Sequence, residues 1–226
     1  MTIAAVIFDM DGVIIDSEHV WDEARRQLAE ERGGRWTENA SHDMMGMSSP
    51  EWSRYMHDVV GLPEAPEEIN GEVVRRLEEI YGAELPLLPG AVDAVRRIGA
   101  RWPLGLASSS NRPLIDLVLE LAGLTGLFVA TVSSEEVARG KPSPDVYLET
   151  AARIGVDPPS CVAIEDSDAG IRSAQAAGMT VVALPNPEFP PSEEALGLAS
   201  VRVESPAELT PALLEGSLTR RPTNPR

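Results

Sequence analysis

Two aspartates, Asp9 and Asp11, close the first apolar run of the chain, and Gly12 follows them. In an extended strand, two side chains at this spacing point to the same side. A glycine lets the chain turn out of the strand, so one carboxylate could face a metal ion while the other turns toward a substrate. An aspartate pair before glycine also occurs in simple turns, and the pair alone leaves both interpretations open.

A run of hydroxyl and amide side chains, Ser108-Ser109-Ser110-Asn111, follows the apolar residues 104–107. Hydroxyls and free backbone N–H groups in front of a helix can hold an anion such as phosphate. The same residues could instead cap the following helix. The segment therefore predicts either an anion site or a helix start.

Charged residues that could bind a phosphate or a metal ion occur in two further segments. Lys141 lies in Gly-Lys-Pro-Ser-Pro, where it could hold one charge beside a phosphate or remain a solvated surface lysine. Glu165 and Asp166 follow the apolar residues 161–164. Adjacent acids suit magnesium, a hard ion that binds carboxylates, waters and phosphate oxygens. Asp168 is explained equally well by the dipole of a helix N-terminus.

The segments between these motifs alternate strand and helix. Apolar, β-branched runs predict strands at 2–8, 104–107, 129–132, 161–164 and 180–184, and 201–209 predicts a last strand and turn. Helical patterns follow at 91–98 and 113–122, then after a cap at Ser143, and again from Asp168. This alternation predicts a parallel sheet covered on both faces, with ligands bound where its strands end.

Residues 16–87 interrupt the alternation, because they hold helical patterns and no convincing strand. Val20, Ala24 and Leu28 share one helical face, and Ser49-Pro50 opens a further helix. We therefore predict an α/β protein of three parts. They are a Rossmann-like parallel-sheet core over 1–15 and 88–215, an inserted all-helical cap over 16–87 and a tail over 216–226.

The predicted sheet would gather the acidic side chains of Asp9, Asp11, Glu165 and Asp166 at one edge. Two carboxylates about 4 Å apart repel each other by about 4 kcal/mol at an effective dielectric constant near 20. Such a cluster is unfavourable unless a divalent cation and Lys141 offset its charge. The residues therefore predict a metal site.

Four motifs of the chain resemble those of the haloacid dehalogenase superfamily. They are Phe8-Asp9-Met10-Asp11-Gly12-Val13, Ser108, Lys141 in Gly-Lys-Pro-Ser-Pro-Asp, and Glu165-Asp166-Ser167-Asp168-Ala169-Gly170. The resemblance runs from about residue 3 to about residue 186, with the motifs in the order and spacing of the superfamily. The subgroup most similar to it is that of the β-phosphoglucomutase-like phosphatases, which carry a small helical cap after the first motif.

The resemblance implies a magnesium-dependent phosphatase acting on a small phosphate monoester, expected to be a sugar phosphate. Asp9 would be the nucleophile that forms an aspartyl-phosphate, and Asp11 the general acid and then the general base. Ser108 and Lys141 would bind the transferring phosphoryl group. Mg²⁺ would be held by Asp9, by Asp11 through its backbone carbonyl, by Asp166, and by Glu165 directly or through water.

The cap is expected to close over the site and select the alcohol part of the substrate. Residues expected to line this pocket are Asp16, Ser17, Trp21, Met45, Gly46, Met47, Ser48, Ser109 and Asn111. For Trp21 the alternative is a place in the core of the cap, as for most tryptophans at helical spacing.

Departures from the subgroup favour a hydrolase over a sugar phosphomutase. The cap histidine of the mutases aligns with Trp21, and their cap arginine aligns with Ser49. A non-catalytic phosphate-binding relative is a further alternative, although every catalytic position is filled. An acid at Asp11 disfavours a dehalogenase. A signalling receiver domain would be far shorter and would lack the helical insertion.

Composition limits the partners of the chain. A formal net charge of -17 over 226 residues opposes binding to nucleic acid or to an anionic membrane. Cys161 is the one cysteine, so no internal disulfide is possible. No signal peptide or membrane-spanning stretch is evident. We expect a cytoplasmic monomer that binds a small-molecule phosphate.

Overall fold

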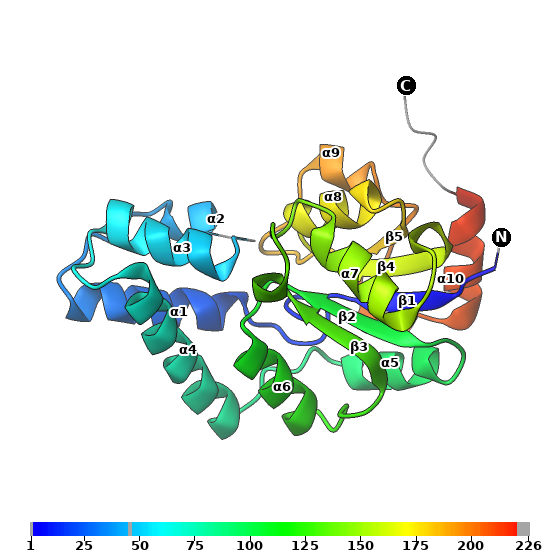
Figure 1. Cartoon of the computed structure of the whole chain (residues 1–226), viewed down its shortest axis with the longest axis horizontal. Coiled ribbons are helices and arrows are strands. Elements are labelled where there is room, and N and C mark those ends of the chain that lie inside the picture. The colour runs from blue at the N-terminus through cyan, green and yellow to red at the C-terminus, as the bar shows by residue number, and fades with distance from the viewer. Residues whose placement is uncertain (1, 45–46, 221–226) are drawn as a thin grey trace.

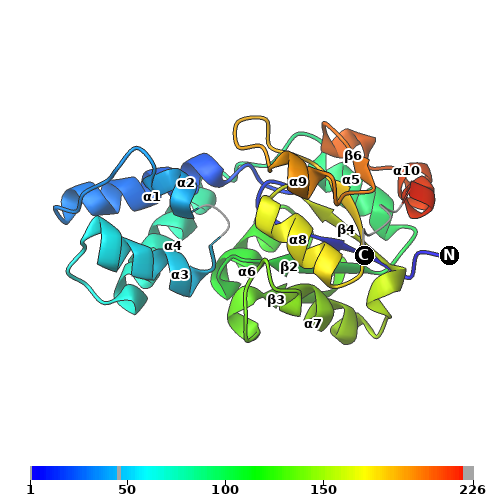
Figure 2. The same cartoon turned by 90° about the horizontal axis from the view of Figure 1, so that it is seen from above.

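The computed structural model describes residues 2–44 and 47–220. It consists of a sheet with helices on both faces and, beside it, a group of four helices (Figure 1). These four are α1 (Glu18–Glu31), α2 (Ala40–Met44), α3 (Ser49–Tyr55) and α4 (Pro66–Ala83). Seen from above, the helical group lies to one side of the sheet, away from the N-terminal end of β1 (Figure 2). No described helix is long and apolar enough to cross a bilayer.

The sheet has six parallel strands in the order β3-β2-β1-β4-β5-β6. The strands are β1 (Ala5–Phe8), β2 (Leu104–Ser108), β3 (Phe128–Ser133), β4 (Cys161–Glu165), β5 (Thr180–Ala183) and β6 (Val201–Arg202). The predicted parallel α/β sheet is therefore confirmed. The last strand is only two residues long, and a short 3-10 turn, Pro206–Glu208, follows it.

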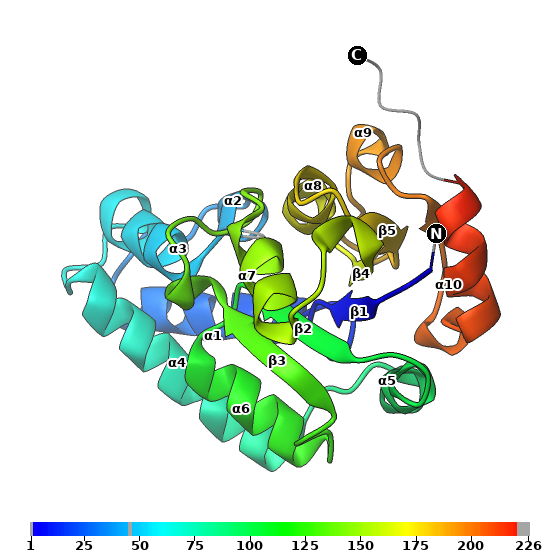
Figure 3. The same cartoon turned by 45° about the vertical axis from the view of Figure 1, so that its right-hand side comes forward.

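Alternate residues of each strand face opposite sides of the sheet, and helices bury both sides. In β1, Val6 and Phe8 belong to one apolar cluster and Ala5 and Ile7 to the other. The first cluster is covered by α5 (Ala91–Gly99), α6 (Arg112–Leu121) and α10 (Pro211–Ser217). The second is covered by α7 (Asp145–Ile154), α8 (Asp168–Ala176) and α9 (Glu193–Leu196). Figure 3 shows α5 and α8 on opposite sides of β1.

The start of α7 differs from the prediction. Ser143 does not cap this helix, because the helix begins at Asp145 and the residue before it is Pro144. The backbone carbonyl of Ser143 instead accepts a hydrogen bond of 2.6 Å from the hydroxyl of Ser173 in α8. Ser143 thus links two helices on the same face of the sheet.

Helices α1 and α3 both pack against α4. Trp52 of α3 and Tyr81 of α4 are among the largest fully buried side chains of the described chain. A π-helical turn, Met56–Val60, ends at Gly61, whose left-handed backbone suits glycine. Described residues between 16 and 86 form helices, turns and loops without a strand, as predicted.

Two neighbouring connections join this helical group to the sheet. Ile15 and Leu87 form an isolated antiparallel bridge, the N–H of Asp16 donates to the carbonyl of Pro86 at 2.7 Å, and that of Leu88 to Ile14 at 3.0 Å. The predicted cap boundaries, after residue 15 and after residue 87, lie beside these hydrogen bonds and stay a prediction. The predicted tail begins inside α10, and Ser217 of that helix is buried. Residues 221–226 of the tail lie outside the described residues.

Gly105 of β2 tests how closely α7 packs on the sheet. A Cβ atom at this position would lie 2.6 Å from Cγ2 of Thr150 and 2.8 Å from Cδ1 of Ile154. Gly105→Ala should therefore lower the free energy of unfolding by about 1–3 kcal/mol in urea titrations. The control is Gly71→Ala in α4, where the added Cβ would contact nothing. This change should raise the free energy of unfolding by up to about 1 kcal/mol. Equal unfolding midpoints for the two variants would contradict the packing described.

Candidate active site

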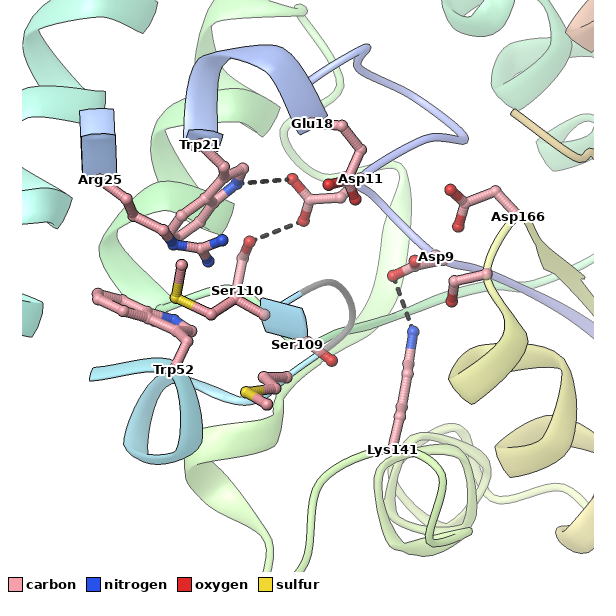
Figure 4. Close-up of a pocket in the computed structure, with 13 residues that line it drawn as sticks. Asp9, Asp11, Glu18, Trp21, Arg25, Trp52, Ser109, Ser110, Lys141 and Asp166 are labelled. Carbon is pink, nitrogen blue, oxygen red and sulfur yellow. Dashed lines mark hydrogen bonds and ion pairs between the residues drawn. The ribbon is translucent and has the colours of Figure 1, made fainter. Parts of the chain in front are cut away.

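The carboxyl ends of the central strands bring three acidic residues together. Asp9 follows β1, Glu165 is the last residue of β4, and Asp166 comes next. Carboxylate oxygens of these three buried residues lie within 4.8 Å of one another. Asp9 and Asp166 line a common pocket with Lys141 (Figure 4). The predicted meeting of acids from distant parts of the chain is thus present.

Lys141 is buried beside this cluster, so it is not a solvated surface lysine. Its Nζ lies 2.9 Å from Oδ1 of Asp9 and 2.6 Å from Oε1 of Glu165. Burial alone would lower the pKa of the Lys141 ammonium, but the carboxylates of Asp9 and Glu165 outweigh burial and raise it. The ammonium is therefore charged at neutral pH.

Glu165 is fully buried, and both of its oxygens accept hydrogen bonds. Oε1 accepts from Lys141 and from the hydroxyl of Tyr147 at 2.7 Å. Oε2 accepts from the backbone N–H of Asp166 at 3.1 Å and from the hydroxyl of Ser167 at 3.1 Å. A carboxylate offers about four acceptor positions. The protein occupies these positions, and the metal contact of Glu165, direct or through water, stays a prediction.

Two glycines make room for the acidic side chains. A Cβ at Gly170 of α8 would lie 1.9 Å from Oε1 of Glu165, and one at Gly12 would lie 1.9 Å from Oδ2 of Asp166. Gly12 also has a φ of +73°, which L side chains rarely adopt. Gly12 thus serves both the turn after β1 and the close approach of Asp166, which lies 154 residues further along.

The charges of the cluster are unbalanced without a cation. Burial raises the pKa of Asp9 to about 8, with Lys141 opposing and Glu165 and Asp11 adding to the rise. Burial, Glu165 and Asp9 raise the pKa of Asp166 well above its ordinary value. Three buried carboxyl groups lie beside one ammonium, and every atom that they offer to a metal ion is an oxygen. This set fits a hard divalent cation such as Mg²⁺.

The side chain of Asp11 turns away from the cluster, toward the helical group. Its Oδ1 accepts from the hydroxyl of Ser17 at 2.6 Å and from the indole N–H of Trp21 at 3.3 Å. Its Oδ2 accepts from the hydroxyls of Ser110 at 2.7 Å and Ser108 at 3.4 Å. The Asp11 carboxylate is thus separate from the three-acid cluster, and its metal contact through the backbone carbonyl stays a prediction.

The three serines at the end of β2 have different surroundings. Ser109 and Ser110 line the pocket. Ser108 is fully buried, and its hydroxyl accepts from the backbone N–H of Ser110 at 3.0 Å. The sequence placed Ser110 in a possible anion site without an individual role, and its hydroxyl lies 2.7 Å from Oδ2 of Asp11, against 3.4 Å for that of Ser108. The contact of Ser108 with a phosphoryl group stays a prediction.

Asn111 does not line the pocket but joins the helical group to the core. Its amide donates to Asn70 of α4 at 3.2 Å and to Glu135 at 2.6 Å. Its carbonyl oxygen accepts from the hydroxyl of Ser49 at 2.9 Å. Asn111 also stands at the cap position of α6 without a side-chain capping bond. Its amide is therefore occupied by the protein rather than free for a substrate.

Of the cap residues expected to line the pocket, some do and others do not. Trp21 and Met47 line the pocket, whereas Asp16 is exposed and lies outside it. Ser17 donates to Asp11, and Ser48 caps α3 with Glu51. Met45 and Gly46 lie outside the described residues.

Several pocket residues were missed by the sequence analysis. They are Glu18, Arg25, Met44 and Trp52, whereas Ser110 and Ser167 stood in the quoted motifs without a role of their own. Arg25 lies four residues after Trp21 in α1, so both are on one helical face. That spacing was a signal that could have found Arg25. Trp52 comes from α3, and nothing local indicates that it meets α1.

The chain is similar in sequence to known hydrolases. The chain matches the model of the haloacid dehalogenase-like hydrolases over residues 3–178. It is 36% identical over 218 residues to hexitol phosphatase B of Escherichia coli O157:H7, covering 92% of this chain and 95% of that protein. It is 34% identical over 182 residues to a fructose-1-phosphate phosphatase of Escherichia coli (strain K12), covering 79% and 95%.

A solved structure supports the fold. The β-phosphoglucomutase of Clostridium difficile superposes with a TM-score of 0.83 at 24% identity, covering 96% of this chain and 98% of that one. At this identity the likeness concerns the fold alone.

The hydrogen bond from Tyr147 to Glu165 gives a stability test of the site. Tyr147→Phe removes a buried donor to a carboxylate and should lower the free energy of unfolding by about 1–3 kcal/mol. Tyr55→Phe is the matched control, because its hydroxyl donates to Asp43 at an exposed position. That change should stay within about 0.5 kcal/mol of the unmodified protein. Denaturant titration measures both, and equal effects would contradict the buried network.

Proposed function

The chain belongs to the haloacid dehalogenase-like hydrolases, and from this we propose that it is a magnesium-dependent phosphatase. Its substrate is a small phosphate monoester of a sugar or sugar alcohol, hydrolysed through an aspartyl-phosphate on Asp9. The carrying observation is the buried Lys141 beside Asp9, in a pocket that also holds Asp166 and the Asp11 carboxylate. The monomeric state expected from the sequence stays a prediction.

The substrate class is supported by the relatives. Hexitol phosphatase B and the fructose-1-phosphate phosphatase are, by name, phosphatases of six-carbon polyol and sugar phosphates. This chain covers 95% of the length of each. The buried ammonium of Lys141 in this pocket fits the phosphoryl group that such substrates share.

In the proposed first step, an oxygen of Asp9 attacks phosphorus, and the bond from phosphorus to the leaving oxygen breaks. The proton of the Asp11 carboxyl group moves to that oxygen, and the alcohol leaves. In the second step, water attacks phosphorus and gives its proton to Asp11. The bond between Asp9 and phosphorus breaks, so inorganic phosphate leaves and both carboxyl groups return to their starting states.

The surroundings of Asp11 suit a group that changes its protonation state. The hydroxyls of Ser17 and Ser110 donate to the carboxylate, and hydroxyls can accept when the carboxyl group is protonated. The indole N–H of Trp21 can only donate. Asp11 is therefore held in one orientation through both steps.

Lys141 and the serine segment are proposed to hold the phosphoryl oxygens. Mg²⁺ would be held by Asp9, Asp166 and the backbone carbonyl of Asp11, and by Glu165 directly or through water. When bound, the ion offsets the carboxylate charge and polarises the phosphoryl group. Glu165 and Tyr147 fix the position of Lys141 beside Asp9.

Hydrolysis is favoured over phosphate transfer between positions of a sugar. Trp21 occupies the histidine position of the mutases and donates to Asp11. Ser49, at their arginine position, is buried and bonded to Asn111 rather than lining the pocket. No described residue at these two positions offers the groups that a mutase uses there.

Phosphate release from a panel of hexose, pentose and hexitol monophosphates tests the proposal. We expect free phosphate from at least one sugar or polyol phosphate, and a loss of at least about a thousandfold in Asp9→Asn. Asp168→Asn is the matched control, because Asp168 pairs with Arg172 outside the pocket, and it should retain most of the activity. An isomerised product without free phosphate would exclude the hydrolase, and substantial turnover by Asp9→Asn would exclude the nucleophile.

Metal binding can be tested without turnover. Mg²⁺ added after treatment with a chelator should raise the melting temperature by on the order of 5 °C, because it binds only the folded state. Asp166→Asn should lose this shift, and Asp168→Asn should keep it. The metal assignment fails if Asp166→Asn responds to Mg²⁺ like the unmodified protein, and unchanged phosphate release in the chelator would also count against it.

A further inference from the structure

Arg25 is a cation of α1 that reaches the active-site pocket from the helical group. Among the described residues that line the pocket, the cations are Lys141 and Arg25. Figure 4 shows Arg25 with Trp21 and Trp52 on one side of the pocket and Lys141 with Asp9 and Asp166 on the other. The phosphoryl group belongs beside Lys141 in the proposed function, so Arg25 faces the rest of the substrate.

Two indole rings fix the Arg25 guanidinium. Its Cζ lies 4.7 Å from the ring centroid of Trp21 and 4.7 Å from that of Trp52. The two rings pack edge to face with centroids 5.9 Å apart. Such cation–π contacts orient a guanidinium, whose N–H groups all point outward in its own plane. Its donors are therefore fixed in direction before a ligand binds.

No described residue satisfies these donors. Arg25 is 8% exposed, and its Nε is closed off from solvent without an acceptor. Within the described chain its two terminal nitrogens have no hydrogen-bonded partner either. Burial lowers the pKa of Arg25 to about 10, with Glu18 and Asp22 opposing, so it stays charged at neutral pH. A buried charge without hydrogen bonds is unfavourable, and an acceptor on a ligand would remove that penalty.

The neighbours of Arg25 indicate which acceptor. Glu18 is half-buried on the same wall, and burial raises the pKa of Glu18, with Asp11 adding and Arg25 opposing. The described lining holds four acidic residues and two cations. A second phosphate or a carboxylate would meet the repulsion of Glu18 and Asp11. A hydroxyl group can accept from Arg25 and donate to Glu18 at the same time.

We propose that Arg25 is a specificity-determining residue that donates to hydroxyl oxygens of the leaving alcohol, with Glu18 accepting from the same hydroxyl groups. The subsite thus selects neutral polyol phosphates over bisphosphates and over phosphates of sugar acids. Met44 and Met47 supply apolar lining for the carbon chain. This inference rests on the proposed phosphatase function.

Three monoesters separate the possible roles of Arg25. Glucitol 6-phosphate has a neutral polyol end, 6-phosphogluconate has a carboxylate at that end, and p-nitrophenyl phosphate has no aliphatic hydroxyl. For the unmodified protein we expect kcat/KM to be highest with glucitol 6-phosphate. Arg25→Met should lower kcat/KM for glucitol 6-phosphate about 10- to 100-fold more than for p-nitrophenyl phosphate, mainly through KM.

A matched variant and a conservative one complete the test. Arg26→Met makes the same change at the next residue, where the side chain pairs with Glu23 and Glu30 on the surface, and should leave the ratio between the substrates unchanged. Arg25→Lys keeps the charge but not the planar fork. Its kcat/KM for glucitol 6-phosphate should also fall more than that for p-nitrophenyl phosphate. This variant keeps the test valid if Arg25→Met unfolds.

Each other outcome has a definite meaning. The inference is overturned if the unmodified protein has its highest kcat/KM with 6-phosphogluconate. It is also overturned if Arg25→Met lowers kcat/KM more for 6-phosphogluconate than for glucitol 6-phosphate. Either result would show that Arg25 binds an anionic group. Equal losses on all three monoesters, with an unchanged melting temperature, would assign Arg25 to the structure of the pocket and also overturn it. Release of phosphate from none of them would overturn the proposed function itself.

Discussion

The ion pairs of Lys141 with Asp9 and Glu165 are the interaction on which the site depends. Acidic groups at the end of a sheet repel one another strongly once they are removed from water. Lys141 offsets part of that repulsion at 2.9 Å and 2.6 Å, and its own burial is tolerable only because both carboxylates surround it. The remaining acidic groups support the proposal that the pocket binds a divalent cation and a phosphate.

The fold provides this cluster because its strands are parallel. The carboxyl ends of β1 and β4 are neighbours in the sheet, so Asp9 and Glu165 meet although they are 156 residues apart in sequence. The carboxylates of Asp166 and Glu165 then lie so close to the backbone that only glycine fits there, at Gly12 and Gly170. Any Cβ there would occupy the space of a carboxylate. These two glycines are part of the site, although neither contributes a functional group.

The helical group completes the pocket with side chains of a different kind. Ser17 and Trp21 hold the Asp11 carboxylate away from the acidic cluster, so the proposed acid and nucleophile have separate surroundings. Asn111 joins α3, α4 and the core through its amide. Arg25, in contact with two indoles, lines the pocket, and its guanidinium has no hydrogen-bond acceptor among the described residues. In the proposed function, the core would bind the phosphoryl end of the substrate and the helical group the alcohol.

The sequence alone determined the order of strands and helices, the helical insertion and the identity of the acidic residues and Lys141. These follow from local periodicity and from the rule that parallel strands end at one edge. Tertiary structure decided the rest. The direction of Asp11, the saturation of Glu165 and the engagement of Asn111 with Ser49, 62 residues away, depend on partners distant in sequence. The contact of Arg25 with Trp52 requires another helix, and no local pattern encodes a contact between two helices.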